Sequence, residues 1–294
     1  MTSSSVDFRM SLMFVTSMVS FVLKPLTRPP TRKTRTELDF HTSSMAQLGN
    51  SLYLAEFNSD RIHVYTTDAA NTRIVNLANV VSLRALASIG NELVLASKSG
   101  LFIAVVANGK LNKIVDEFTS AVATNSRTIY ALNPKSGEIL VVQRNGDKWD
   151  LTKRILLKDF KSKCTNTLRS FYLQVKENHI YVSSWSTRAI QRYNFTGEHV
   201  QNLEIGSAHE PLCIAVCATD VDNNLLVSDK KHGLRVLNNS GHWETYTQTV
   251  INPTYVVFDG KHTMYALTNT ADGRGPNIEF STCLEVYNLH NINP

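Results

Sequence analysis

Seven basic side chains and one indole are concentrated in three short stretches of the chain. They are Lys158, Lys161, Lys163, Arg169, Trp185, Arg188, Lys230 and Lys231. Ammonium and guanidinium groups bind carboxylates and phosphates, and the flat face of tryptophan can stack on a base or on another side chain. If the fold brings the three stretches together, they predict a binding site for a partner of acidic character, either RNA or a protein segment.

The residue types that carry catalysis or hold metals form no recognisable pattern. The nine histidines are scattered without HxH or HxxxH spacing, and no GxSxG nucleophile motif is present. Cys164, Cys213, Cys217 and Cys283 lack CxxC spacing, and we expect them to be buried thiols in a reducing compartment. The sequence therefore predicts no catalytic residue, no metal site and no cofactor.

The positive charge is unevenly distributed along the chain. Its net charge is +5, and residues 1–40 hold six basic residues against three acidic ones. The remaining chain is close to neutral, which excludes a uniformly basic domain that coats nucleic acid. A basic binding site must therefore come from local clustering of side chains.

A short strand pattern recurs six times and provides the elements that must position these residues. The second strand of each copy reads NSLYLA, NELVLA, RTIYAL, NHIYVS, NNLLVS and HTMYAL, and a third apolar strand follows each one. The apolar anchors of these strands are Leu52, Leu93, Ile129, Ile180, Leu225 and Met264. A repeat of roughly 40 to 45 residues matches four-stranded propeller blades. The sequence thus predicts an all-β, six-bladed β-propeller of four-stranded antiparallel blades.

The fifth copy, at residues 211–243, is the clearest, and it closely resembles an NHL repeat. The resemblance lies in a Pro and apolar strand, an Asn-hydrophobic-Val-Asp unit that ends at Asp229, and an Arg-hydrophobic strand before a Gly turn. NHL domains occur in ubiquitin-ligase chains or bind RNA and proteins, but no RING, B-box or coiled coil is present here, so the resemblance does not imply ligase activity. It implies a structural role for Asp229 at the strand end.

Some six-bladed propellers are calcium-dependent lactonases or related hydrolases, and these provide the main alternative function. They hold the metal with acidic side chains on their inner strands, because Ca²⁺ requires oxygen ligands. The inner strands expected here are nearly free of carboxylates, and Ala215 and Val216 stand where the lactonases place an acidic residue. We therefore expect the metal site to be absent and the protein not to be an enzyme.

The ends of the chain predict how the ring closes. We expect residues 1–33 to be a leader or a disordered basic linker and residues 34–294 to form the propeller. Because the sixth copy lacks a fourth strand, Thr34–Phe40 is predicted to pair as its outer strand. The apolar run Met10–Leu23 is too short to span a bilayer; we expect a cytoplasmic monomer, with a signal peptide and a secreted protein as the alternative.

The predicted topology places the basic stretches on one face. In a four-stranded meander, the connections between strands two and three emerge on the same side as the links between blades. The three basic stretches belong to such connections, so we expect a non-catalytic recognition or scaffold propeller that binds its partner through this face. Alternatives are a divergent lactonase-like or lyase-like hydrolase, a secreted ligand-binding propeller, and ordinary solvated lysines with no binding role.

Overall fold

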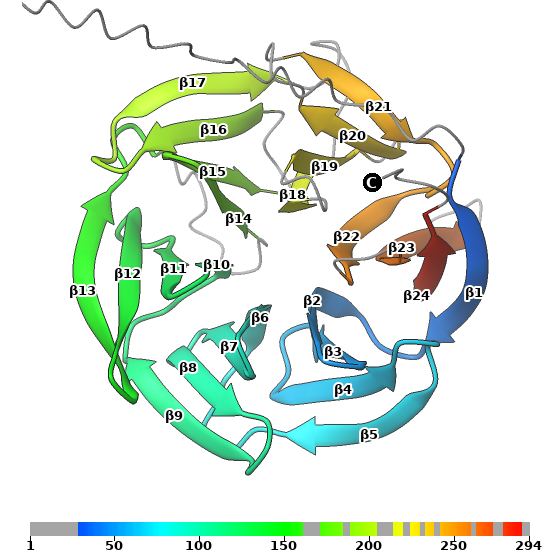
Figure 1. The fold of residues 1–294 in the computed structure, drawn as a ribbon, viewed down its shortest axis with the longest axis horizontal. Coiled ribbons are helices and arrows are strands. Elements are labelled where there is room, and N and C mark those ends of the chain that lie inside the picture. The colour runs from blue at the N-terminus through cyan, green and yellow to red at the C-terminus, as the bar shows by residue number, and fades with distance from the viewer. Residues whose placement is uncertain are drawn as a thin grey trace, which may run out of the picture.

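The protein is a ring of six four-stranded antiparallel sheets (Figure 1). The structure is a computed structural model that describes residues 29–160, 171–184, 189–204, 214–219, 224–229, 233–237, 242–259, 263–272 and 279–289. In each sheet the strands are ordered from the centre of the ring to its perimeter, as the repeat pattern predicts. The prediction of an all-β, six-bladed propeller is confirmed.

Blades 1 to 3 follow the chain in regular order. Blade 1 contains β2 (Thr42–Leu48), β3 (Ser51–Glu56), β4 (Arg61–Thr66) and β5 (Asn71–Asn76). Blade 2 contains β6 (Leu83–Ile89), β7 (Glu92–Ser97), β8 (Gly100–Val105) and β9 (Lys110–Val115). Blade 3 contains β10 (Ala121–Asn125), β11 (Thr128–Asn133), β12 (Glu138–Asn145) and β13 (Lys148–Leu156).

Blades 4 to 6 complete the ring. Blade 4 contains β14 (Phe171–Lys176), β15 (His179–Ser184), β16 (Ala189–Asn194) and β17 (His199–Glu204). Blade 5 contains β18 (Ile214–Thr219), β19 (Leu225–Asp229), β20 (Gly233–Leu237) and β21 (Trp243–Thr247). Blade 6 contains β22 (Pro253–Phe258), β23 (Thr263–Asp272), β24 (Glu279–Asn288) and, as its outer strand, β1 (Thr31–Leu38).

The ring is closed by pairing the N-terminal strand with the last strand of the chain. β1 runs antiparallel to β24, in a register from Thr31 opposite Asn288 to Leu38 opposite Thr282. The predicted pairing is confirmed, but the strand begins three residues before the expected Thr34, and Phe40 lies beyond its end. Arg32 and Arg35 both contact the buried carboxylate of Glu285, which fixes β1 with ion pairs as well as backbone bonds.

The core lies between neighbouring blades. The six anchors of the repeat are buried, and the apolar clusters combine residues from adjacent sheets, as in the cluster that joins blades 1 and 2 through Val64 and Leu95. The inner strands are also joined by hydrogen bonds. Leu86 N donates to Ser44 Oγ across 3.0 Å, and Thr124 Oγ1 donates to Ser88 O across 2.9 Å. Packing and polar joints therefore fix the angle between successive blades.

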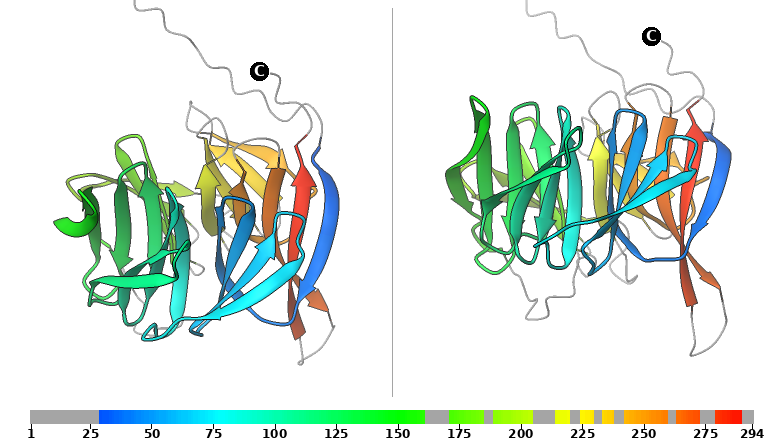
Figure 2. Two further views of the ribbon diagram at one scale, coloured as in Figure 1. Left: turned by 60° about the horizontal axis from the view of Figure 1, so that its bottom comes forward. Right: turned by 90° about the horizontal axis from the view of Figure 1, so that it is seen from below.

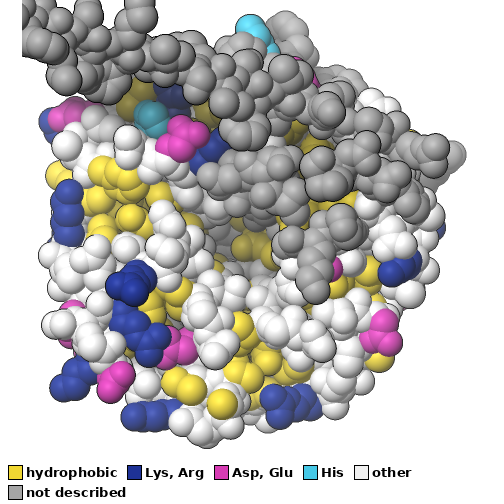
Figure 3. Space-filling view, viewed as in Figure 1, with side chains coloured by type: hydrophobic (Ala, Val, Ile, Leu, Met, Phe, Trp, Pro, Cys, Tyr) yellow, Lys and Arg dark blue, Asp and Glu magenta, His cyan; other side chains and the backbone are white. Residues whose placement is uncertain are grey.

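The two faces of the ring differ in the connections that they carry. We call the end with the connections between second and third strands and the links between blades the loop face, and the opposite end the turn face. Figure 2 shows both from the side, with the long β23 and β24 projecting downwards at the loop face. Figure 3 shows the turn face, which is hollowed at its centre and has charges of both signs around the rim of blades 1 to 3.

The described parts of the chain contain no helix long and apolar enough to cross a membrane. The apolar run Met10–Leu23 lies outside them.

Candidate functional site on the loop face

Of the eight predicted binding residues, Lys158 is the one that the structure describes. It follows β13 at the perimeter, where Lys158 N donates to Gly197 O across 2.8 Å. Its ammonium group is ion-paired with Glu198, in the turn between β16 and β17 of blade 4. Gly197 has a φ of +85°, and a Cβ there would lie 2.0 Å from Leu156 O, so this close approach requires glycine. Lys158 therefore helps to join blades 3 and 4 at the rim.

The other seven predicted residues lie outside the described parts of the chain. They are Lys161, Lys163, Arg169, Trp185, Arg188, Lys230 and Lys231. Their convergence on one face stays a prediction.

A polar residue lies four positions after each anchor in the second strand of every blade, and in blades 1 to 5 it ends that strand at the loop face. These residues are Glu56, Ser97, Asn133, Ser184, Asp229 and, within the longer β23, Thr268. Asn133 Oδ1 accepts hydrogen bonds from the backbone N–H groups of Lys135 and Ser136 at 3.0 and 3.3 Å. Ser97 Oγ similarly donates to Gly100 O across 2.9 Å. In blades 2 and 3 this position therefore caps the following connection, and fully buried Asp229 occupies it in blade 5.

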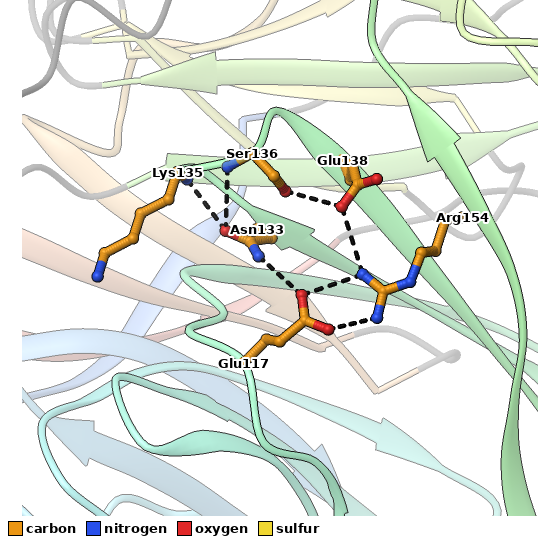
Figure 4. Close-up of polar contacts among 6 residues, drawn as sticks. All are labelled: Glu117, Asn133, Lys135, Ser136, Glu138 and Arg154. Atoms are coloured by element: carbon orange, nitrogen blue, oxygen red, sulfur yellow. Dashed lines mark hydrogen bonds and ion pairs between the residues drawn. The ribbon is translucent and has the colours of Figure 1, made fainter.

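In blade 3 the polar groups of the loop face compensate one another (Figure 4). Arg154 Nη1 donates to Glu117 Oε2 across 3.0 Å and to Glu138 Oε2 across 3.3 Å, while its Nη2 contacts Glu117 Oε1. Asn133 Nδ2 donates to the same Glu117 across 3.1 Å. Hydrogen bonding to Glu117 raises the pKa of Arg154, and Arg154 lowers the pKa of Glu117. The Glu117 carboxylate is thus held ionised in a structural network that also includes Glu138.

Blade 1 places a histidine beside a carboxylate, but the imidazole is enclosed. His63 Nε2 lies 2.9 Å from Glu56 Oε2, and the other oxygen of Glu56 is 2.5 Å from Arg61 Nη2. Phe40 stacks on the His63 ring with a centroid separation of 3.5 Å and an interplanar angle of 11°. His63 is 4% exposed, and its Nδ1 is shielded from water without a partner. In this arrangement neither ring nitrogen can exchange a proton with a substrate.

The inner strand of blade 2 holds, just after the link from blade 1, a cation without an anionic partner. Arg84 lies in β6, the inner strand, at a register shift between Leu83 and Ala85. Its side chain is 5% exposed, and burial lowers the pKa of its guanidinium group. Nη2 donates to Asn58 Oδ1 across 3.2 Å, while Nε and Nη1 have no hydrogen-bond partner. The ring centroid of Phe57 lies 5.2 Å from Arg84 Cζ.

Exposed apolar side chains accompany the links between blades. Ile251, Leu156 and Val81 are 70%, 59% and 56% exposed, the highest values among the large hydrophobic residues that the structure describes. Val81 and Ile251 lie in the links that follow β5 and β21, and in each case the preceding valine is buried. Leu156 ends β13 before the link to blade 4. The loop face therefore exposes apolar surface at several blade boundaries.

Sequence reasoning missed Arg84, although the sequence carries a signal for it. The sequences of the six inner strands contain no carboxylate, and their charged residues are Arg84 and Lys176. Lys176 lies at the turn-face end of β14, 3.8 Å from Glu177. An isolated arginine in the otherwise apolar segment LRALAS could have been singled out. Within the described residues, no group of three His, Cys, Asp or Glu side chains could hold a metal.

Comparison with known proteins supports the fold and leaves the function open. No protein-family model matches the chain, and no curated protein matches it in sequence. A structural genomics protein of unknown function from Bacteroides thetaiotaomicron has a TM-score of 0.62 and 14% identity, covering 90% of this chain and 75% of that one.

Two further solved structures with similar folds are those of a lyase and of U3-55K. A catalytically inactive virginiamycin B lyase from Staphylococcus aureus with quinupristin has a TM-score of 0.56 and 10% identity, covering 86% of this chain and 99% of that one. U3-55K has a TM-score of 0.53 and 12% identity, with 83% and 80% covered. At these identities the similarity shows the propeller fold alone.

Proposed function

We propose that this propeller is a non-catalytic recognition platform that binds an acidic segment of a partner protein through its loop face. The observation that supports this most directly is the exposure of Val81 and Ile251 in the links between blades. Exposed apolar side chains supply contact area when a partner protein covers the face that carries them. Each would provide an apolar contact beside the polar connections.

The charges of the loop face favour an acidic partner. Glu56 and Glu117 are engaged by cations of their own blades, so they offer little negative charge to a ligand. Arg84 has two guanidinium nitrogens without an acceptor, and the predicted basic stretches of blades 3 to 5 would add positive charge. Complementary charge would guide a segment rich in Asp and Glu towards this face.

A protein partner fits the described residues better than RNA does. Single-stranded RNA binds to aromatic platforms on which its bases stack, and strong binding of this kind needs several such rings. The exposed large hydrophobic side chains in the described links are aliphatic instead. Trp185 is the aromatic residue predicted for this face from sequence, and RNA binding remains an outcome that the experiment below can detect.

A lyase-like enzyme is the second candidate, because the fold resembles that of virginiamycin B lyase. The described residues give it little support: within them, the histidine that contacts a carboxylate is His63, and it is enclosed. Incubation of the protein with quinupristin tests this candidate. Product formation at a rate above that of a heat-denatured sample would replace the recognition function by an enzymatic one.

The recognition function is tested by quantitative affinity capture with matched surface variants. Val81→Glu combined with Ile251→Glu places charge on the loop face, whereas Ile74→Glu makes the same type of change on the outer strand β5, where Ile74 is also exposed. We expect the loop-face variant to lose at least about tenfold in affinity for a captured protein, and the β5 variant to bind normally. Nuclease treatment should not reduce capture.

Two additional variants test the predicted basic residues in the same assay. Lys230→Glu with Lys231→Glu removes charge, and Trp185→Ala removes the indole. Equal binding by all loop-face variants, each with a normal circular dichroism spectrum, would exclude this face as the docking surface. Loss of capture after nuclease treatment would instead indicate RNA.

A further inference from the structure

Arg84 is an exception to the way this protein handles buried charge. A buried guanidinium group is normally paired with a carboxylate, because its removal from water is otherwise strongly unfavourable. Glu285, the other buried charged residue whose contacts are resolved, follows the rule and is met by two arginines. Arg84 has the neutral oxygen of Asn58 as its acceptor.

The neutral acceptor is shared, which weakens its contribution further. Asn58 Oδ1 also accepts a hydrogen bond from Ser82 Oγ across 2.5 Å, so one carbonyl oxygen serves both donors. The face of the Phe57 ring adds a cation–π contact, which compensates only a fraction of the lost hydration. Nε and Nη1 have no protein acceptor within the part of the chain that the structure describes.

The position of Arg84 is suited to a ligand that reaches the loop face. Arg84 lies near the start of the inner strand β6, where the chain enters blade 2 from the loop face. Asn58 is exposed and Val81 is more than half exposed, so the guanidinium group lies just beneath the surface. A displacement of the side chain or of its immediate neighbours would bring Nε and Nη1 to an incoming acceptor.

We propose that the guanidinium group of Arg84 is a receptor for a carboxylate group of the bound partner, supplied by an Asp or Glu side chain or by a C-terminus. This inference rests on the proposed function, because it names the chemical group that an acidic protein segment inserts. A carboxylate provides two anionic oxygens for the unpaired N–H groups and restores the charge balance. The neighbouring Val81 then contacts the apolar part of the same segment.

The unpaired guanidinium group of Arg84 therefore lowers the stability of the unliganded protein and raises its affinity for a carboxylate. Replacing an unpaired buried cation by an apolar side chain of similar length removes the desolvation penalty of that cation. No partner charge is left unpaired in the core by this change. Arg84→Met should raise the melting temperature of the full chain by roughly 2–4 °C, the shift expected for a modest gain in a domain of this size. An arginine with a purely structural role would produce a fall.

The first test uses small acids on the unmodified full chain. Acetate, succinate and inorganic phosphate are compared with sodium chloride at equal ionic strength, and the melting temperature is followed. The carboxylates should raise it in a concentration-dependent way, since a ligand that binds only the folded state stabilises that state. Arg84→Met should abolish this response, while Arg73→Met, which removes an exposed arginine on β5, should preserve it.

The second test uses a synthetic peptide with several Asp and Glu residues and its Asn and Gln counterpart. We expect the acidic peptide to bind the wild type and Arg73→Met equally and Arg84→Met roughly 10- to 100-fold more weakly, the range for loss of a charge-assisted hydrogen bond. Arg84→Lys should recover the charge but only part of the affinity, because a lysine lacks the planar fork of donors.

The outcomes separate this inference from the proposed function. Acidic-peptide binding that is unchanged in Arg84→Met would overturn the role of Arg84 and leave the recognition function intact. A response to acetate and succinate without any peptide binding would support the carboxylate receptor and contradict a protein partner. If the wild type does not respond to any carboxylate, or if phosphate alone acts, the inference is wrong.

Discussion

Two arginines at the loop face, Arg154 in blade 3 and Arg84 in blade 2, have opposite environments. Arg154 is partly exposed, yet it contacts two carboxylates, and its pKa is raised. Arg84 is buried, has no carboxylate, and its pKa is lowered. The more accessible cation is thus the better compensated one, the reverse of what stability alone would select.

The difference separates a structural use of arginine from a functional one. The Arg154 network links β13 with β12 and with the chain that enters blade 3, so its loss affects the packing of one blade. The few contacts of Arg84 do not offset the cost of burying its charge, and the proposed carboxylate ligand would offset that cost. Other compensated and uncompensated groups of the propeller allow this distinction to be tested.

Removal of β1 should have the largest effect, because it removes the outer strand of blade 6 and both cations that contact Glu285. Deletion of residues 1–38 removes Arg32, Arg35 and the backbone pairing with β24, while deletion of residues 1–28 retains the whole strand. We expect the longer deletion to lose at least about 3–5 kcal/mol of unfolding free energy, measured by urea denaturation. Glu285→Gln should recover part of the loss in the longer deletion only. Equal urea midpoints for the two deletions would contradict the role of β1 in closure.

Loss of one buried hydroxyl between inner strands should come next. Ser44 is fully buried, and its Oγ both accepts from Leu86 N and donates to Leu86 O, at 3.0 and 3.3 Å. Ser44→Ala leaves both backbone groups without this partner, and we expect it to lower the unfolding free energy by about 1–3 kcal/mol. The neighbouring Ser43→Ala, which removes one long hydrogen bond of 3.5 Å, is the control and should have a much smaller effect. Similar losses in the two variants would show that the Ser44 joint is unimportant.

The hydroxyl of Tyr193 is a buried group that lacks a hydrogen-bond partner and is neutral at physiological pH. Burial, with a smaller effect of Asp159, raises its pKa to about 12. Its contribution to stability is complete below pH ~10 and declines as the pH rises towards 12, because the unfolded chain ionises first. Tyr193→Phe should therefore have little effect at pH 7 and should flatten the alkaline loss by roughly 2–3 kcal/mol by pH 12.

Tyr287 is the matched comparison for this variant. Its hydroxyl donates to Glu285, so Tyr287→Phe should destabilise the protein at pH 7, unlike Tyr193→Phe. Urea midpoints measured from pH 7 to pH 12 distinguish the two cases. An equal loss at pH 7 would mean that the Tyr193 hydroxyl has a partner in solution.

Disruption of the Arg154 network should have the smallest effect, since its members are partly exposed. Glu117→Gln should lower the unfolding free energy by less than about 1 kcal/mol at pH 7. Because Arg154 lowers the pKa of Glu117, this contribution is present above pH ~4 and is lost as the pH falls through the folded pKa. Arg154→Met should remove the same pH dependence. A loss as large as that of Ser44→Ala would indicate a stronger network than its exposure implies.

The sequence was sufficient for the fold because the same apolar pattern is repeated in every blade. Leu52 and Ile129 occupy equivalent places in the repeat and are fully buried. The closing strand was harder to delimit: β1 starts at Thr31, before the alternating Leu38 and Phe40 that were used to predict it. Its first residues pair through the backbone and through Arg32, and neither interaction requires an apolar side chain.

The candidate site was much less predictable than the fold. Charge and expected position single out the basic residues in the sequence, but neither reveals that Lys158 is neutralised by Glu198 of a different blade. Arg84 was overlooked because its importance depends on the absence of a nearby carboxylate. A missing partner is a property of three-dimensional packing, and the local pattern LRALAS gives only an indication of it.

The closure of the ring also has a consequence for synthesis of the protein on the ribosome. Arg32 and its partner Glu285 are 253 residues apart, so β1 emerges from the ribosome long before its partner strand. At roughly 5–20 residues per second, β1 would wait on the order of 10–50 s for β24. Its sequence, TRKTRTEL, suits that delay, because frequent charges protect an unpaired strand from pairing with other chains. The segment that completes the propeller is thus one that can remain safely in water until the rest has been made.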